Sequence, residues 1–145
     1  MRINLVNLPW NKNGRLGVRA GSRWPFTSQP EKDNRIHYIP FPFFLAYAAA
    51  LLKRGANEVN LIDAIAEEIE NETLVRKIES NNPQLLVIET STPSFENDIK
   101  IISELHQKLP DCQKALCGSH ATVFPKKILD ENDFIDYILI GEDEY

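Results

Sequence analysis

The segment "KALCGSHATVFP", Lys114 to Pro125, decides how this chain is organised. It opens with the apolar run Lys114–Cys117, which has the length and character of a buried strand. The run stops at Gly118-Ser119-His120-Ala121, where small and polar side chains leave the backbone nearly bare. Pro125 then favours the first turn of a helix. A strand, a bare loop and a helix in this order predict one unit of an α/β sheet, with a loop that something approaches closely.

Similar strand-like runs recur along the whole chain. Together with the first run they are Ile3–Asn7, Glu58–Ile62, Leu85–Glu89, Lys114–Cys117 and Tyr137–Ile140. Two of them, "LLVIE" and "YILI", are apolar throughout, which indicates strands that are covered on both faces. Helical patterns lie between the runs, at Phe43–Arg54, Glu70–Ser80, Ser94–Leu109 and, more briefly, from Pro125 through Leu129.

This alternation of strands and helices predicts a parallel sheet. Right-handed crossovers then favour an α/β, doubly wound, flavodoxin-like five-stranded parallel sheet with helices on both faces. Gly55 is expected to stop the first helix. In the third helix, apolar residues such as Phe95 and Ile102 recur at helical spacing, and Ser94 is expected to cap the first turn.

Composition indicates one globular domain. The 145 residues suffice for one core and are too few for two ordinary domains. Hydrophobic residues make up 43% and charged residues 26% of the chain, whose formal net charge is -5. The basic residues are scattered and the net charge is negative, which argues against nucleic-acid binding. No apolar run reaches the roughly 18 residues that span a bilayer. Since the N-terminus also lacks a secretion-signal pattern, a cytoplasmic location is expected.

A long arm, at about residues 8–40, interrupts the alternation between the first strand and the first helix. It is rich in Arg, Gly, Pro and Asn. Loops of this length are usually functional or disordered, and its aromatic residues argue against plain disorder. Arg19, Arg23 and Trp24 are therefore candidates for a lid over a ligand or for a contact with another domain.

Several kinds of site are absent from the sequence. Cys112 and Cys117 are the only cysteines, and two thiolates do not hold an iron–sulfur cluster, so both are expected to be packing residues. The chain has neither GxGxxG nor GxxxxGK[ST], so the dinucleotide fingerprint and the P-loop are missing. As a catalytic set, the residues that follow the predicted strands show no metal-ligand spacing and no paired carboxylates. No catalytic residue and no metal ligand is predicted.

The ends of the predicted strands identify candidate binding residues, because ligands of open parallel sheets bind beyond the carboxyl ends of the strands. Glycine permits a close backbone approach, and hydroxyl groups donate and accept hydrogen bonds at short range. The candidates at these ends are Asp63, Ser91, Thr92, Gly118, Ser119, His120, Gly141 and Glu142. This set predicts a surface that holds a large polar ligand.

The segments "ETSTPSF", "CGSHATVFPKKIL" and "DFIDYILIGEDE", with "FFLAYAAALLKRGANEVNLIDA", resemble the N-terminal cobalamin-binding domain of cobalamin-dependent radical S-adenosylmethionine enzymes. That family includes methyltransferases and enzymes of the anaerobic magnesium-protoporphyrin ester cyclase type. The resemblance covers essentially the whole chain and rests on the order and spacing of the segments. It implies a flavodoxin-like fold with cobalamin over the strand ends. Ser91 and Thr92 would line the nucleotide tail of the cofactor, and Gly118 and Ser119 would let it pass.

Two departures from the pattern of cobalamin domains bear on the cofactor. Many such domains carry Asp-x-His-x-x-Gly after the second strand, with the His ligating cobalt. Here Asp63 fits, but Ile65 stands at the His position and Glu68 at the Gly position. The resemblance therefore implies a base-off corrinoid without a protein His ligand. In addition, the pair after the fourth strand is Gly118-Ser119 instead of two glycines.

The resemblance also implies a catalytic partner. In the family, a C-terminal radical barrel binds S-adenosylmethionine and a 4Fe-4S cluster through Cys-x-x-x-Cys-x-x-Cys, and this chain stops at "GEDEY" without such a motif. A truncated chain is expected, which binds a corrinoid, contacts that barrel and catalyses nothing alone. The full-length protein would be a radical methyltransferase or cyclase. Two alternatives stay open: a flavodoxin-like docking or substrate-recognition domain that has lost the cofactor, and a nucleotide- or flavin-binding domain.

Overall fold

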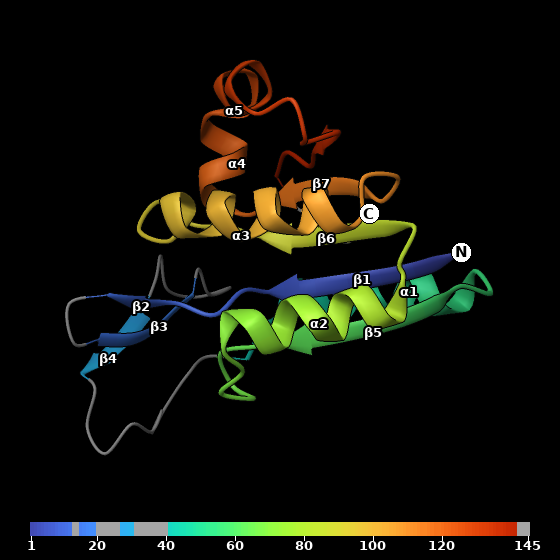
Figure 1. The fold of residues 1–145 in the computed structure, drawn as a ribbon, viewed down its shortest axis with the longest axis horizontal. Helices are drawn as coiled ribbons and strands as arrows, with labels where there is room; N and C mark the ends of the chain where they lie inside the picture. The colour runs from blue at the N-terminus through green and yellow to red at the C-terminus, as the bar shows by residue number, and fades with distance from the viewer. Residues whose placement is uncertain (13–14, 20–26, 31–40, 142–145) are drawn as a thin grey trace.

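The computed structural model describes residues 1–12, 15–19, 27–30 and 41–141. Its main sheet has five strands in the order β5-β1-β6-β7-β8, and every pairing is parallel. The strands are β1 (Arg2–Asn7), β5 (Glu58–Asp63), β6 (Leu85–Glu89), β7 (Gln113–Cys117) and β8 (Tyr137–Ile138). The strand order reverses between β1 and β6, as in flavodoxin-like folds, and Figure 1 shows β1, β5, β6 and β7 pointing to the same edge. The predicted fold class is confirmed.

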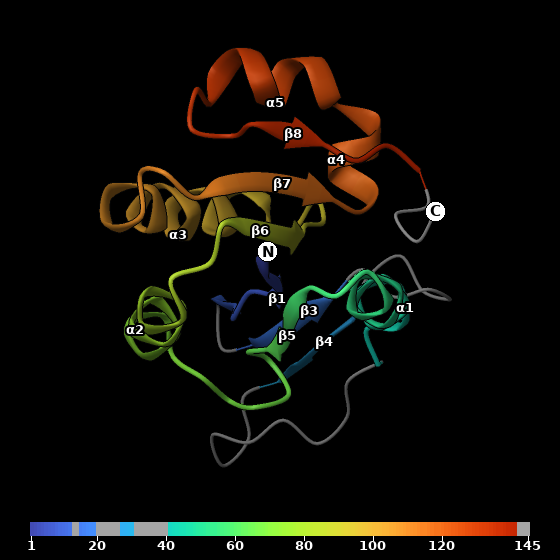
Figure 2. The ribbon, with the colours of Figure 1, turned by 90° about the vertical axis from the view of Figure 1, so that its right-hand side faces the viewer.

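Helices cover both faces of this sheet. In the described residues they are α1 (Phe43–Arg54), α2 (Asn71–Asn81), α3 (Phe95–Lys108), α4 (Ser119–Val123) and α5 (Pro125–Glu131). Figure 2 shows α2 and α3 on one face and α1 on the other. The short helix α4 was not predicted, and it begins directly after Gly118.

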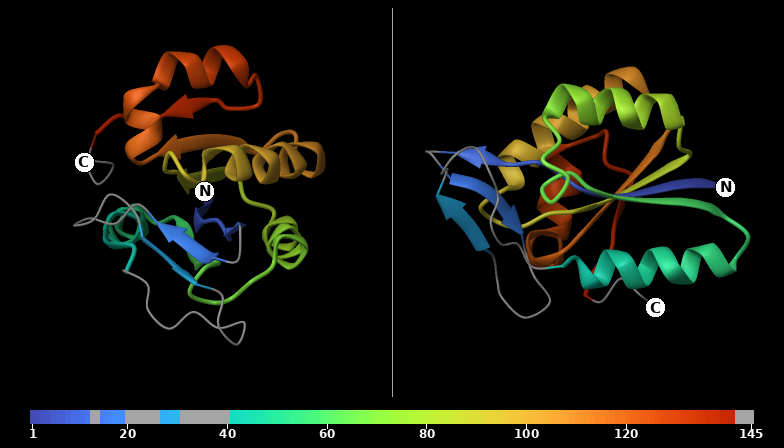
Figure 3. Two further views of the ribbon diagram at one scale, coloured as in Figure 1. Left: turned by 90° about the vertical axis from the view of Figure 1, so that its left-hand side faces the viewer. Right: turned by 90° about the horizontal axis from the view of Figure 1, so that it is seen from below.

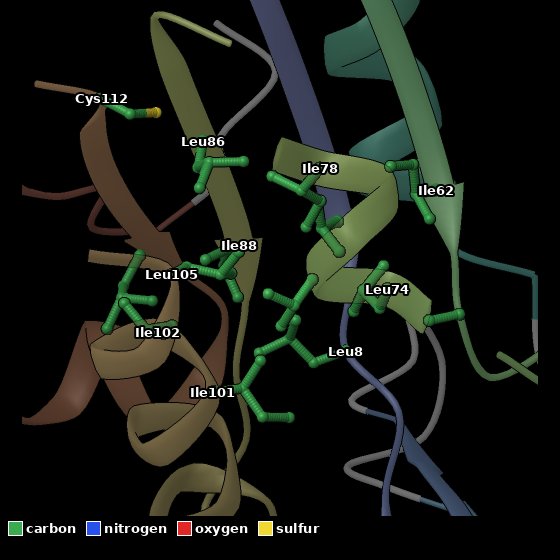
Figure 4. Packing of buried hydrophobic residues seen from close by; sticks show 14 of the residues in the cluster. Leu8, Ile62, Leu74, Ile78, Leu86, Ile88, Ile101, Ile102, Leu105 and Cys112 are labelled. Carbon is green, nitrogen blue, oxygen red and sulfur yellow. The ribbon is translucent and has the colours of Figure 1, made fainter. Parts of the chain in front are cut away.

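Strand β6 explains why a continuously apolar run lies at the centre of the sheet. Its side chains alternate between two cores. Leu86 and Ile88 pack with residues of α2 and α3, whereas Val87 packs with residues of α1 on the opposite face. The first core includes Leu74, Ile78, Ile102 and Leu105 (Figure 4). Full burial of one such side chain contributes about 1.5–3 kcal/mol, so both faces of β6 hold the sheet to its helices.

Part of the long arm forms a second sheet that was not predicted from the sequence. Its strands β2 (Asn11–Lys12), β3 (Arg15–Arg19) and β4 (Thr27–Pro30) pair antiparallel in the order β2-β3-β4. Figure 3 shows this sheet beyond the carboxyl end of β1. Short strands without regular alternation of apolar residues carry little sequence signal. Arg23, Trp24 and the side chain of Arg19 lie outside the described residues.

The prediction that Ser94 caps α3 is wrong. Ser94 stands before the helix with helical dihedral angles, φ −98° and ψ −17°, and its side chain makes no capping hydrogen bond. The N–H of Phe95 already donates to the Ser91 carbonyl at 2.9 Å. The Ser94 hydroxyl is therefore directed into the protein, where it donates to Oδ2 of Asp98 at 2.7 Å.

Two further expectations concern the cysteines and the membrane. Cys112 and Cys117 are both buried and free, as expected for packing residues. Within the described ranges, no helix combines the length and the apolar character that a membrane crossing requires.

The turn after α1 places alanine where glycine is favoured. Helix α1 ends at Arg54 before Gly55, as predicted, but the left-handed residue of the turn is Ala56, with φ 58°. We expect Ala56→Gly to raise the free energy of unfolding by about 0.5–1 kcal/mol, since a side chain costs about 1–2 kcal/mol in this conformation and glycine loses part of that gain as entropy.

The matched control is Ala50→Gly, in the exposed interior of the same helix. It should lower the free energy of unfolding by about 1 kcal/mol, because glycine is a poor helix former. Urea unfolding of both variants measures the two effects. Shifts of the same sign would contradict the assignment of the strain to Ala56.

Candidate functional site

The candidate residues gather where the strands of the main sheet end. In register, Asn7 of β1 pairs with Asp63 of β5 and Glu89 of β6, and Glu89 pairs with Cys117 of β7. The loops that follow these residues are therefore neighbours in space. The described candidate residues lie at the strand ends or in the loops that follow them, at the edge where the sequence predicts a binding site.

Gly118 is bare because another strand end comes close to it. Its backbone has φ 94° and ψ −176°, a region open almost only to glycine. A Cβ at this position would lie 2.5 Å from the Thr90 carbonyl oxygen. The Thr90 N–H donates to the Cys117 carbonyl at 3.0 Å, which draws the ends of β6 and β7 together. The close approach that the sequence indicated is thus made by Thr90 of the same chain.

The loop after β6 directs its two predicted hydroxyl groups in different directions. Ser91 is 2% exposed, and its Oγ lies 3.0 Å from Oγ of Ser94 inside the turn. Thr92 is exposed, and its Oγ1 lies 3.1 Å from Nδ1 of His120. Thr92 therefore presents a side chain to the outer surface of this edge, whereas Ser91 does not.

His120 is held between aromatic rings at the same edge. Its ring stacks on Phe95 at a centroid distance of 4.1 Å and lies 4.9 Å from the ring of Phe124. Burial, and then the charge of Lys127, lower the pKa of His120, so the imidazole is neutral near pH 7. Thr92 thus engages Nδ1 of this ring.

Asp63 shapes the turn after β5. Its Oδ1 accepts the Ala66 N–H at 3.2 Å, and its own N–H donates to Oε1 of Glu67 at 3.2 Å. Ile65, at the position of the family's His, is 2% exposed. Glu68, at the position of the family's Gly, has a left-handed φ of 52°. The turn thus has a positive φ at Glu68, where the family pattern has glycine, and a buried Ile65, where that pattern has the ligating His.

The remaining candidates lie on or near α4. Ser119 is exposed in the first turn of this helix. The Gly141 N–H donates to Oγ1 of Thr122 at 3.1 Å, which joins the end of the β8 segment to α4. Glu142 lies outside the described residues. Across the part of the chain that the structure describes, no group of His, Cys, Asp and Glu side chains is arranged to hold a metal ion.

Sequence reasoning missed Asp98, which supports the loop after β6. This carboxyl is 2% exposed, and its Oδ2 accepts hydrogen bonds from Thr90 Oγ1 at 2.8 Å and Ser94 Oγ at 2.7 Å. Burial raises the pKa of Asp98 to about 7, against the opposing effect of these hydrogen bonds. The signal was present in the sequence: helical spacing puts Asp98 on the same buried face as Ile102 and Leu105.

Comparisons with known proteins identify a family and two similar sequences. A family model of the B12 binding domain matches residues 34–145. The chain is similar to two proteins named anaerobic magnesium-protoporphyrin IX monomethyl ester cyclase. It is 32% identical to that of Cereibacter sphaeroides over 107 residues, which are 71% of this chain and 17% of the relative. It is 30% identical to that of Rubrivivax gelatinosus over 107 residues, which are 71% of this chain and 19% of the relative.

The chain thus spans less than a fifth of the length of these relatives, at 17% and 19%. No solved structure gives a significant match. The family match covers the strand-end loops after β5, β6 and β7 together with the helices that follow them. The chain therefore belongs to the B12 binding domain family, in agreement with its resemblance to the cobalamin-binding domains of radical S-adenosylmethionine enzymes.

Proposed function

We propose that this domain binds cobalamin in its base-off form at the carboxyl edge of the sheet and presents it to a radical S-adenosylmethionine methyltransferase or cyclase. The observation that carries the proposal is the Thr92–His120 pair, which lies at the carboxyl edge of the sheet in a B12 binding fold. Cobalamin would supply a carrier for a methyl group or assist radical chemistry, and the protein would bind and orient it.

The side chains at this edge fit the polar periphery of a corrinoid. Thr92 and Ser119 present exposed hydroxyl groups, and His120 presents part of a neutral ring. Such groups can donate hydrogen bonds to the phosphate of cobalamin, and they can both donate to and accept from its amides and ribose. At Gly141, no atom of the described residues lies within 4 Å of the position that a Cβ would take.

Ile65 supports a corrinoid without a protein His ligand. Its hydrocarbon side chain has no lone pair for cobalt, and it is buried in the protein. Asp63 in the same turn is engaged with the Ala66 N–H. On this proposal, the domain holds cobalamin by its periphery and leaves the cobalt without an imidazole from the loop after β5.

The proposal extends to the whole protein. The relatives are named as ester cyclases and are much longer than the matched region, which is 17% and 19% of their lengths. We therefore place the domain with a C-terminal radical domain of the same polypeptide, which would bind S-adenosylmethionine and a 4Fe-4S cluster. Corrinoid binding is the part of the function that the described residues would perform.

The test is an ultraviolet–visible titration of the 145-residue chain with hydroxocobalamin, followed by gel filtration. We expect a one-to-one complex with a base-off spectrum that elutes with the protein. Thr92→Val and His120→Ala should each weaken binding about fivefold, the effect of one lost hydrogen bond of about 1 kcal/mol.

Ser80→Ala is the matched control, because it removes an exposed hydroxyl at the far end of α2. It should bind as the wild type does. A wild-type chain that retains no colour would contradict cobalamin binding by this domain and favour a docking role. A complex that elutes with the protein but has a base-on spectrum would contradict the base-off form and leave cobalamin binding supported.

A further inference from the structure

A buried polar network lies directly beneath the loop after β6. Its centre is Asp98 in the first turns of α3, whose Oδ2 accepts hydrogen bonds from Thr90 at 2.8 Å and Ser94 at 2.7 Å. Thr90, Ser94 and Asp98 are all buried. The two donors flank the loop, so one carboxyl oxygen holds both of its ends.

Ser94 extends this network to the residue that precedes Thr92. Its Oγ accepts the Ser91 N–H at 3.2 Å and lies 3.0 Å from Ser91 Oγ. Ser91 is therefore linked to Asp98 through one hydroxyl group. Thr92 follows Ser91 directly, so the backbone that carries Thr92 begins at an anchored residue.

Thr92 in turn connects this loop to the one after β7. Its Oγ1 meets Nδ1 of His120 at 3.1 Å, and the His120 ring stacks on Phe95, three residues before Asp98 on α3. A continuous path thus runs from the buried carboxyl through Ser94 and Ser91 to the exposed pair at the surface.

The cost of burying Asp98 argues for a specific task. A buried carboxyl loses its hydration, and an apolar residue on the same helical face would pack without that penalty. The two hydroxyl donors offset part of the loss and at the same time fix the turn. An aliphatic side chain at position 98 could not accept from Thr90 and Ser94 and would leave both hydroxyl groups without this partner.

We propose that Asp98 is a positioning residue for the corrinoid site: its buried carboxyl holds the turn Thr90–Ser94 in the shape that sets Thr92 against His120. This inference rests on the proposed function, because the geometry it maintains is that of the proposed binding edge. Asp98 itself is too deeply buried to touch the cofactor and acts through Thr92.

The first arm of the test reads the turn without any ligand. Amide hydrogen exchange at Ser91 should quicken about tenfold in Asp98→Ala, since the N–H of Ser91 loses the anchoring of its acceptor Ser94. Asp98→Asn should exchange like the wild type, because its amide oxygen still accepts from both hydroxyl groups. Glu104→Ala, on the exposed face of the same helix, is the control.

The second arm measures the dissociation constant for hydroxocobalamin. It is carried out under conditions in which circular dichroism shows that every variant is fully folded. If the turn keeps its binding shape in about a tenth of Asp98→Ala molecules, the apparent dissociation constant rises about tenfold. Asp98→Asn should stay within about twofold of the wild type, because its amide oxygen still accepts both hydrogen bonds. Asp98→Leu fills the site without accepting a hydrogen bond, so it should weaken binding as Asp98→Ala does, whereas a role in packing alone would leave it near the wild type.

Should Asp98→Ala fail to fold, Ser94→Ala replaces it, because this variant cuts the link to Ser91 and leaves the Thr90–Asp98 hydrogen bond. Unchanged exchange at Ser91 and unchanged affinity in these variants would overturn the positioning role while the wild type still binds. A wild type that does not bind hydroxocobalamin overturns the proposed function, and the inference falls with it.

Discussion

Replacing Gly118 by alanine is expected to lower the free energy of unfolding by about 3 kcal/mol or more. Two costs add at this position. The backbone has φ 94° and ψ −176°, which residues other than glycine rarely adopt. The new Cβ would also lie 2.5 Å from the Thr90 carbonyl oxygen, a backbone atom that cannot rotate away. Relief would require the ends of β6 and β7 to separate, against the hydrogen bond from Thr90 to Cys117.

Gly141→Ala is the control that separates these two costs. Gly141 also has a positive φ, 88°, but in the described part of the chain no atom lies within 4 Å of the position that its Cβ would take. Its replacement should cost about 1–2 kcal/mol from backbone strain alone. Urea unfolding of the two variants gives the comparison. If both lose the same amount, the contact with Thr90 is relieved without cost and the explanation of the bare position is wrong.

Asp98→Asn is expected to remove a large pH dependence of stability. The pKa of Asp98 is raised from 3.8 to about 7 in the folded protein, mainly by burial. Between these values the folded state binds more protons at this site than the unfolded state, so the free energy of unfolding falls as the pH rises. The contribution is complete near pH 4 and is lost once the pH exceeds about 7. A shift of this size corresponds to a few kcal/mol, on the order of 1.4 kcal/mol for each pH unit.

The measurement is the free energy of chemical unfolding of the wild type and of Asp98→Asn between about pH 4 and about pH 8. This range runs from near the ordinary pKa of Asp98 to above its raised pKa. As the pH rises, the free energy of unfolding of the variant should increase relative to that of the wild type. His120 has the opposite influence, because its lowered pKa makes stability rise with pH, but both proteins retain it and it cancels in the difference. Asp130→Asn, which loses an exposed ion pair with Lys126, should differ from the wild type by less than about 1 kcal/mol. Parallel curves for wild type and Asp98→Asn would show that Asp98 titrates normally.

Elements with strong internal patterns were predictable, and those shaped by their neighbours were not. The bounds of β6 and α1 agree with prediction, since an apolar strand and an Ala- and Leu-rich helix carry their signal locally. Helix α4 has a short sequence, "SHATV", with low helix propensity, and begins where the left-handed Gly118 turns the chain. The cap predicted at Ser94 failed because the buried carboxyl of Asp98 offered its hydroxyl another partner.

The candidate site divides in the same way. Parallel strands of one sheet end at one edge, so the order of strands in the chain was enough to predict that Thr92, Gly118 and His120 meet there. The sequence could not tell that Ser91 points inward while its neighbour Thr92 points outward. That difference depends on Ser94, whose Oγ lies 3.0 Å from Oγ of Ser91 inside the turn.

By itself, the sequence determined the α/β order, the edge of the sheet that is the candidate for ligand binding, and the absence of a His at the position of Ile65. Each follows from residue types and their succession along the chain. Only the tertiary structure decided that Thr90 is what comes close to Gly118, that His120 lies on Phe95, and that Asp98 holds the loop from below. These are contacts between segments that only packing brings together. Their distances, their burial and the raised pKa of Asp98 exist only once the sheet and helices have excluded water.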